Sequence, residues 1–332
     1  MKKKVAYLLA AFAMMIAFAV FAARPVSAAD GFLDVSKVTT SSVTLRWNKT
    51  AFKAEGEKVQ TLGYKLYYGT STEKMKQFGE KLSAKATGKT VTGLKARKRY
   101  FFRLKVILKH TNLKTGKSKT VLKDYVDNPL AIYTLPEKID TIRTTSSAVK
   151  AKKLRFKWKD VNPSDNSFGY EYEVKTRSGN MKDNGSTAEN GVVLKNASNA
   201  TYYLGRVRST YTFENRDGKK TCYGEWSNWA ALLSTPVVIG ASLSGGKINV
   251  TWTEMKGVDG YDIYITNDNW KGYYKAGYTS TGATSGTIET VKGKKFSYKR
   301  GESYEVSIVA RKKIDGKNYY SPGDNDVTIY TT

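Results

Sequence analysis

A glycine–tyrosine pair that follows a tryptophan occurs three times in this chain of 332 residues, and each pair opens an apolar run. The three sets are Trp47 with Gly63-Tyr64, Trp158 with Gly169-Tyr170, and Trp252 with Gly260-Tyr261. From tryptophan to tyrosine the intervals are 17, 12 and 9 residues, so one loop changes length while its flanks persist. Recurrence of this kind is typical of a repeated structural module. The sequence therefore predicts a tandem array rather than one large enzyme fold.

Around each pair the side chains alternate between apolar and polar, which is the period of a half-buried β-strand. In the first copy Val43, Leu45 and Trp47 alternate with Thr44 and Arg46. Equivalent apolar runs are Tyr64-Leu66-Tyr68 and Tyr100-Phe102-Leu104-Val106 in the first copy, Leu154-Phe156-Trp158, Tyr170-Tyr172-Val174 and Tyr203-Gly205-Val207-Ser209 in the second, and Ile248-Val250-Trp252, Tyr261-Ile263-Ile265 and Tyr304-Val306-Ile308-Ala310 in the third. Helical periodicity is not apparent after the N-terminal segment, so we expect an all-β protein. Gly205 departs from the pattern and is expected to weaken its strand.

The N-terminal segment has the pattern of an export signal. Three lysines at positions 2–4 precede an apolar stretch at 5–23, and Val26-Ser27-Ala28 offers a small-residue cleavage site. We predict a signal peptide over residues 1–28. An uncleaved membrane anchor is the alternative, because about 19 apolar residues can span a bilayer. With cleavage, the expected product is a secreted, extracellular protein without a membrane span, and association with the cell wall is one expected location.

Two proline-containing junctions divide the remaining chain. Pro136 and Pro236 each follow an apolar, strand-like run, and proline at such a place ends one strand's pairing. We therefore predict modules over residues 30–135, 136–235 and 236–332, each about the size of a single-core β-sandwich. Cys222 is the one cysteine, so disulfides cannot hold the modules together and each needs its own core. We expect Cys222 to be a small strand residue, with an intermolecular bridge as the alternative.

The segment that runs from Thr92 to Leu104 resembles the corner and sixth strand of fibronectin type III domains. The family places a leucine six residues before a tyrosine, and Leu94 with Tyr100 fits that spacing. Tyr298 with Tyr304 keeps the spacing, whereas Leu194 stands nine residues before Tyr203, so a longer loop is expected in the second module. The tryptophans also fit the family's core position.

The third copy is similar to modules in secreted proteins of Gram-positive bacteria, through Gly260-Tyr261, Tyr304 and Tyr320-Ser321-Pro322. The resemblance covers essentially the whole chain after the signal. It implies three tandem fibronectin type III, immunoglobulin-like β-sandwiches in a secreted bacterial protein, used for spacing, adhesion or polymer binding. Fold alone does not fix function.

Signals for catalysis are weak. His110 is the one histidine, and we expect it to be a solvated residue in the loop after the sixth strand, among several lysines. One histidine and one cysteine exclude a His/Cys metal site by number, and no glycine-rich phosphate loop precedes a helix. Asp259 and Asp262 are interpreted as turn and surface-strand residues. We therefore expect no enzyme activity, cofactor or metal, with a glycan-active hydrolase in an atypical β-sandwich as the alternative.

Charge points to anionic partners. Residues 30–135 hold 22 basic and 8 acidic side chains, whereas residues 236–332 hold 13 and 10. Arg97, Lys98 and Arg99, with the lysines between positions 109 and 123, supply much of the excess. Cell-wall polyanions, acidic polysaccharides, anionic lipids and host glycans are the extracellular candidates, and attraction to them should rise at low salt. Nucleic acid is not expected, because no base-reading motif accompanies the charge. A well-solvated surface with no specific partner remains the alternative.

An aromatic cluster follows the third glycine–tyrosine strand. It comprises Trp270, Tyr273, Tyr274 and Tyr278 beside amide and acidic side chains. Such rings could stack on sugars, or half of them could pack into the core. Trp270 lies in a turn-rich stretch and is expected to be the most exposed.

A second aromatic group is similar to the Trp-Ser-x-Trp-Ser box of cytokine-receptor modules. Trp226 and Trp229 occupy the two tryptophan positions, and Ala230 replaces the final serine. Arg206 and Arg208 face away from the core on the sixth strand. We predict a cation–π ladder of these four residues that stiffens the second module, with a carbohydrate platform as the alternative.

Together these features predict a non-enzymatic, secreted binding, adhesion or spacer protein. Its expected partners are polyanionic or carbohydrate polymers at the bacterial surface or in the extracellular matrix. A pure spacer that is held by a partner along one edge strand is a further possibility.

Overall fold

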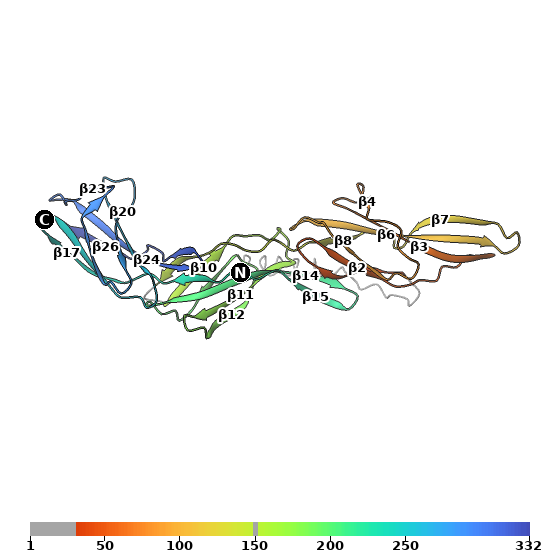
Figure 1. Ribbon diagram of the computed structural model, residues 1–332, viewed down its shortest axis with the longest axis horizontal. Coiled ribbons are helices and arrows are strands. Elements are labelled where there is room, and N and C mark those ends of the chain that lie inside the picture. The colour runs from red at the N-terminus through yellow and green to blue at the C-terminus, as the bar shows by residue number, and fades with distance from the viewer. Residues whose placement is uncertain (1–30, 149–151) are drawn as a thin grey trace, which may run out of the picture. The chain divides into compact units, whose positions relative to one another are not determined.

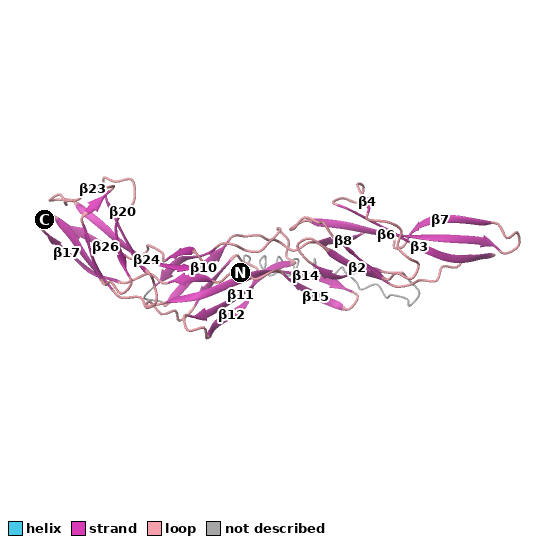
Figure 2. Cartoon of the chain, viewed as in Figure 1, coloured by secondary structure: helices cyan, strands magenta, loops and turns pink. Residues whose placement is uncertain are grey.

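The computed structural model describes residues 31–148 and 152–332, so the predicted signal peptide lies outside the described residues. Strands and loops make up the described chain, and Figure 2 shows no helix in it. The all-β expectation is confirmed.

A three-stranded and a five-stranded sheet recur three times along the chain (Figure 1). In repeat 1 the sheets are β1-β2-β5 and β4-β3-β6-β7, with β8 paired to β6. Its strands are β1 Leu33–Val38, β2 Val43–Trp47, β3 Glu57–Gly69, β4 Lys76–Gln77, β5 Gly88–Val91, β6 Arg99–Asn112, β7 Ser118–Asp124 and β8 Leu130–Tyr133.

In repeat 2 the sheets are β13-β10-β9 and β12-β11-β14-β15, with β16 paired to β14. Its strands are β9 Ile142–Ala148, β10 Lys153–Trp158, β11 Phe168–Thr176, β12 Met181–Thr187, β13 Gly191–Leu194, β14 Tyr202–Asn215, β15 Gly218–Tyr223 and β16 Ala230–Leu233.

Repeat 3 has the sheets β17-β18-β21 and β20-β19-β24-β25, with β26 paired to β24, and a small β22–β23 hairpin. Its strands are β17 Val238–Ser244, β18 Lys247–Trp252, β19 Gly260–Asn267, β20 Tyr274–Ser280, β21 Ser285–Ile288, β22 Thr290–Val291, β23 Lys294–Lys295, β24 Ser303–Ile314, β25 Lys317–Tyr320 and β26 Asp326–Tyr330. This recurrence is the repeated fibronectin-like sandwich that the sequence predicts.

The chain forms two compact units. Within the described ranges, one comprises residues 31–34, Leu45–Lys89 and Phe101–Leu130, and the other comprises Val35–Thr44, Thr90–Tyr100 and residues 131–148 and 152–332. Repeats 2 and 3 lie in the second unit and share one continuous apolar cluster, which includes Ile139 and Ile329. The expectation of a separate core for each module is therefore wrong for these two repeats.

Strand β16 explains the shared cluster. All four of its residues are buried, and the strand lies against β24 and β25 of repeat 3. Gly205 pairs with Ala230, and the Leu232 side chain lies over the glycine, where an added Cβ would be 2.6 Å from the leucine Cδ1. The glycine therefore makes room for the Leu232 side chain in the core.

The tryptophan and the glycine–tyrosine pair meet in every repeat. Ring centroids are 5.7 Å apart for Trp47 and Tyr64, 5.1 Å for Trp158 and Tyr170, and 5.3 Å for Trp252 and Tyr261. In repeat 3 Gly260 has φ +148°, and an added Cβ would lie 2.1 Å from the Thr279 carbonyl oxygen. The glycine is required because the edge strand passes too closely for any side chain.

One tyrosine hydroxyl closes the corner before the long strand of each repeat. It accepts a hydrogen bond from the backbone N–H five residues earlier, in the pairs Lys95–Tyr100, Ser198–Tyr203 and Lys299–Tyr304. The expected longer loop in repeat 2 is therefore wrong. Ala197, six residues before Tyr203, is buried, and its N–H donates to the Lys152 carbonyl. Leu94 and Tyr298 make the equivalent bond in their own repeats, each to the turn after the first strand. A small apolar residue thus replaces leucine there.

Candidate binding site

A pocket of about 480 Å³ in repeat 3 combines aromatic rings with lysines. Trp270, Phe296 and Tyr304 form its aromatic lining. Its charged lining comprises Lys292, Lys294, Lys295, Lys299 and Glu302. Four ammonium groups against one carboxylate make this pocket a place where an anionic group would be attracted.

The β22–β23 hairpin delivers three of these lysines. Lys292 and Gly293 have φ values of 54° and 72°, the left-handed conformation that a two-residue hairpin turn requires at both positions. Because the turn is tight, Lys292, Lys294 and Lys295 are held within one short, exposed segment.

The aromatic side of the pocket is tied to the core of repeat 3. Trp270 makes edge-to-face contacts with Tyr274 and Tyr304, at centroid distances of 5.8 and 6.1 Å. Lys292 Nζ lies 3.7 Å from the Tyr274 ring centroid and 5.6 Å from that of Trp270. Trp270 is therefore half-buried, and the expectation that it would be the most exposed ring is wrong. Its turn folds back onto the sheet.

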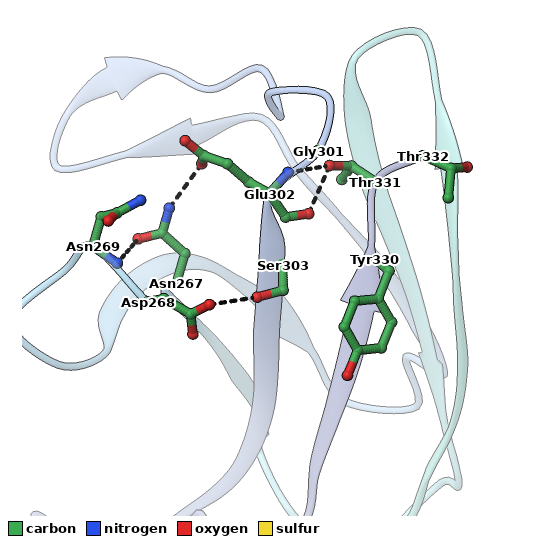
Figure 3. A pocket seen from close by; sticks show the side chains of 9 residues that line it. All are labelled: Asn267, Asp268, Asn269, Gly301, Glu302, Ser303, Tyr330, Thr331 and Thr332. Atoms are coloured by element: carbon green, nitrogen blue, oxygen red, sulfur yellow. Dashed lines mark hydrogen bonds between the residues drawn. The ribbon is translucent and has the colours of Figure 1, made fainter.

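A polar cup of about 530 Å³ adjoins this pocket and shares Asn267, Asn269 and Glu302 with it. In Figure 3 the Asn267 amide nitrogen points to Glu302, to which it donates at 2.9 Å. On the other side of the cup, Ser303 donates to Asp268 at 2.9 Å. These internal bonds occupy the carboxylates, so the cup offers few free polar groups.

The other two predicted aromatic residues point away from the pocket. Tyr273 and Tyr278 are 40% and 73% exposed, and neither lines it. The Tyr273 hydroxyl lies 2.7 Å from Glu305 and 2.8 Å from Asp326. Burial, followed by these two hydrogen bonds, raises the pKa of Tyr273. The predicted cluster of four rings is thus divided between two surfaces.

The basic tripeptide of repeat 1 is partly engaged in structure. Arg97, Lys98 and Arg99 are all exposed. However, Arg97 Nη2 donates to the Asn162 carbonyl at 2.6 Å, and the Arg99 guanidinium lies 5.9 Å from the Tyr133 ring centroid. The Lys98 backbone N–H donates to Thr134 Oγ1 at 3.0 Å.

The four residues predicted to form a ladder lie together. Arg206 Cζ is 4.4 Å from the Trp226 centroid and 4.6 Å from that of Trp229. Arg208 Cζ is 4.4 Å from Trp226. Each arginine also holds a carboxylate: Arg206 pairs with Glu173 at 2.6 Å and Arg208 with Glu171 at 2.5 Å.

The sequence did not reveal the ends of the ladder. Tyr223 stacks beyond Arg208 at 4.2 Å, and Lys175 stacks beyond Trp229 at 4.9 Å. Cations therefore lie over the rings of both Trp226 and Trp229. Little ring surface remains there for a sugar.

Two expectations about charged residues are wrong. His110 lies within β6 and is half-buried, with Nδ1 2.5 Å from Glu57, because the β6–β7 hairpin extends beyond it. Asp262 is buried, with ion pairs to Lys275 at 3.0 Å and Arg311 at 3.5 Å. Asp259 is exposed, as expected of a turn residue. Cys222 is a buried residue of β15.

Within the described ranges, no group of three or more histidine, cysteine, aspartate or glutamate residues could hold a metal ion. No helix among these residues is long and apolar enough to cross a membrane.

The lysines of the pocket were missed from the sequence. Lys292, Lys294, Lys295 and Lys299 stand more than twenty positions after Trp270. A signal was present, because four lysines within eight residues surround a glycine turn and Phe296. Only the folding of the β22–β23 hairpin onto the β19–β20 loop brings that run to the tryptophan.

The fibronectin type III domain family matches residues 29–121. Among solved structures, the FN1–FN3 domains of chicken CNTN1 are 17% identical, with 91% of this chain and 98% of that chain covered and a TM-score of 0.29. A two-domain fibronectin type III segment of chicken tenascin is 16% identical, with 58% and 96% covered and a TM-score of 0.26. No curated protein matches. Residues 29–121 thus match a fibronectin type III domain, a module commonly used for adhesion or spacing, and the described chain is a series of such β-sandwiches.

Proposed function

We propose that this protein is a non-enzymatic, secreted binding protein that holds polyanionic carbohydrate polymers at the bacterial surface or in the surrounding matrix. The observation that carries the proposal is the pocket of repeat 3, where four lysines surround an aromatic wall. Lysines attract acidic groups, and the rings offer apolar area to the sugar to which those groups are attached.

The charge of the whole chain supports the same partner. Its formal net charge is +27, or 27 − 4 = +23 without the four basic residues of the predicted signal peptide. An anionic polymer is therefore attracted over a long range before it reaches any one pocket. Attraction of this kind is screened by salt, with a Debye length of about 8 Å at physiological ionic strength. Retention that weakens with salt is therefore the expected signature.

Glycan hydrolysis is the rival interpretation, and Glu305 with Asp326 is the pair that bears on it. Both carboxylates contact the Tyr273 hydroxyl, and both residues are exposed on an open sheet. An acid and base that act on a glycan work best where water is excluded. Neither residue lines the two cavities described above. Binding without chemistry is therefore the better interpretation.

The test is retention on an acidic polysaccharide, such as alginate beads, across a salt series. The pocket variant Lys294→Ala/Lys295→Ala is compared with Lys182→Ala/Lys195→Ala, which removes two exposed lysines from repeat 2. Each lysine near an anionic surface contributes about 1 kcal/mol, so the affinity of the pocket variant should fall by about tenfold or more. The control should change by less than about twofold. Equal losses in the two variants would reduce the pocket to part of the general charge, and salt-insensitive binding would contradict the proposal.

A further inference from the structure

Five tyrosines from four different segments of repeat 3 lie on the solvent side of its five-stranded sheet. They are Tyr264, Tyr273, Tyr278, Tyr320 and Tyr330, and we call them the tyrosine face. Residues that pair directly across neighbouring strands point to the same side of a sheet. Along β24, the core side is formed by Tyr304, Val306, Ile308 and Ala310, so the residues between them face outward.

The register places the tyrosines in successive rows. Arg311 of β24 pairs with Tyr320 of β25. Tyr278 of β20 pairs with Asp262, which pairs in turn with Val309. The next rows contain Tyr264 opposite Ser307, and Tyr330 opposite Ser303. From Arg311 to Ser303 these rows extend over about 27 Å of strand.

Exposure is concentrated on this surface. Among the nine exposed large apolar or aromatic side chains of the described residues, four belong to the tyrosine face. Tyr278 and Tyr330 are each 73% exposed, and Tyr320 is 46% exposed. Figure 3 shows Tyr330 beside the strand that carries Ser303. A set of exposed rings on one sheet is more than the scattered surface residues that need no explanation.

Charged groups contact two of the rings, Tyr278 and Tyr273. The buried Asp262 carboxylate pairs with Lys275 and Arg311, whose cations lie 5.9 and 5.6 Å from the Tyr278 centroid. Tyr273 is fixed by its contacts with Glu305 and Asp326. These two rings are therefore positioned before any partner arrives, which lowers the entropy cost of binding.

We infer that the tyrosine face binds a carbohydrate chain through its uncharged sugar rings. The tyrosines offer flat apolar area. The exposed Glu305, Asp326 and Lys275 beside them can also bond to hydroxyls, because a carboxylate accepts, and an ammonium donates, more than one hydrogen bond. The core of a protein–protein interface is depleted of charged residues, whereas here they alternate with the rings. Two cations against three carboxylates also distinguish this face from the lysine pocket. The inference is independent of the polyanion proposal, because it does not depend on net charge.

The test is retention on amorphous cellulose, chitin, xylan and mannan at about 1 M salt, where the Debye length is about 3 Å. We expect the wild type to be retained on at least one of these polymers. Tyr278→Ala/Tyr320→Ala should weaken that retention by about tenfold or more. Tyr223→Ala, which removes an exposed ring from repeat 2, is the matched control and should bind like the wild type.

Two further variants keep the test decisive. Tyr330→Ala removes one exposed ring near the edge of the face, and it replaces the double variant if that protein has lost its folded circular-dichroism spectrum. Lys294→Ala/Lys295→Ala should leave high-salt retention unchanged, even if it abolishes binding to alginate. Absence of retention on all four polymers, or an equal loss in Tyr223→Ala, would overturn the inference without touching the polyanion proposal.

Discussion

Repeats 2 and 3 use the same residue types in opposite ways. In repeat 2 the rings of Trp226 and Trp229 lie between cations, and the arginines hold carboxylates. In repeat 3 cations also approach rings, yet Tyr278 and Tyr330 remain largely exposed. Aromatic and basic residues therefore do not identify a binding site by themselves. What decides is whether the chain itself supplies the partner for each ring.

Two buried tyrosines of repeat 2, Tyr170 and Tyr211, give the largest expected effect. Burial raises the pKa of Tyr170 and of Tyr211 to about 12, and a hydrogen bond to Asp160 adds to the effect at Tyr170. Unfolded tyrosine ionises near pH 10, so the neutral phenols add stability that is complete below pH 10 and is lost as pH rises through 12. The loss is about 3 kcal/mol for each residue.

Urea unfolding between pH 8 and 12 measures this loss. Tyr170→Phe cannot ionise, so its unfolding free energy should decline less steeply over the same range. An unfolding free energy of the wild type that stays constant to pH 12 would contradict the enclosure of both phenols.

The ladder itself gives the next effect. Arg206→Ala/Arg208→Ala removes the cation–π contacts and leaves Glu171 and Glu173 without their partners. We expect a loss of about 2–3 kcal/mol, which lowers the melting temperature by several degrees. Tyr278→Ala/Tyr320→Ala in repeat 3 should change stability by less than about 0.5 kcal/mol, as exposed substitutions do. Thermal unfolding followed by circular dichroism compares the two, and similar losses would erase the contrast between the repeats.

The expected effect of replacing Trp270 is intermediate between that of the repeat 2 ladder and that of the exposed tyrosines of repeat 3. Trp270 is half-buried against Tyr274 and Tyr304, while it also lines the lysine pocket. Because a fully buried tryptophan replaced by alanine costs about 3–5 kcal/mol, we expect about half of that for Trp270→Ala. Alginate retention should fall as well.

The conservative control for that site is Trp270→Phe, which should restore most of the stability. Wild-type binding to alginate by a folded Trp270→Ala protein would show that the lysines act without the ring.

The sequence predicts the ladder well because the evidence for it is local. Alternation along one strand places Arg206 and Arg208 on the same side, and the spacing of Trp226 and Trp229 places their rings within reach. The same logic accounts for the buried Val43, Leu45 and Trp47. Where a period of two residues carries the information, strand faces can be assigned from the chain alone.

The surfaces of repeat 3 depend on pairing between distant segments. Tyr278 and Tyr320 share a face only because β19 and β24 lie between their strands in a particular register. No local pattern fixes that register, since it follows from the buried face and the loop lengths. The same limit explains Lys292 beside Trp270, and the burial of Asp262, whose partners Lys275 and Arg311 come from two other strands.

The smallest expected effect concerns an ion pair of repeat 3, between Asp259 and Lys312 at 2.8 Å. Although burial acts in the opposite direction, hydrogen bonds from Lys312 and Lys313 lower the pKa of Asp259 below its usual value. Its contribution is therefore present above the unfolded pKa and is lost as pH falls through the lower folded value. The carboxylate is 43% exposed, so solvent screening limits this contribution to about 0.5 kcal/mol. Asp259→Asn should reduce the drop in unfolding free energy below pH 4 by about 0.5 kcal/mol, as measured by urea unfolding between pH 2 and 6. The tyrosine face should stay intact in this variant. A loss as large as that of the ladder variant would mean that surface charge, and not enclosure of rings, sets the difference between the two repeats.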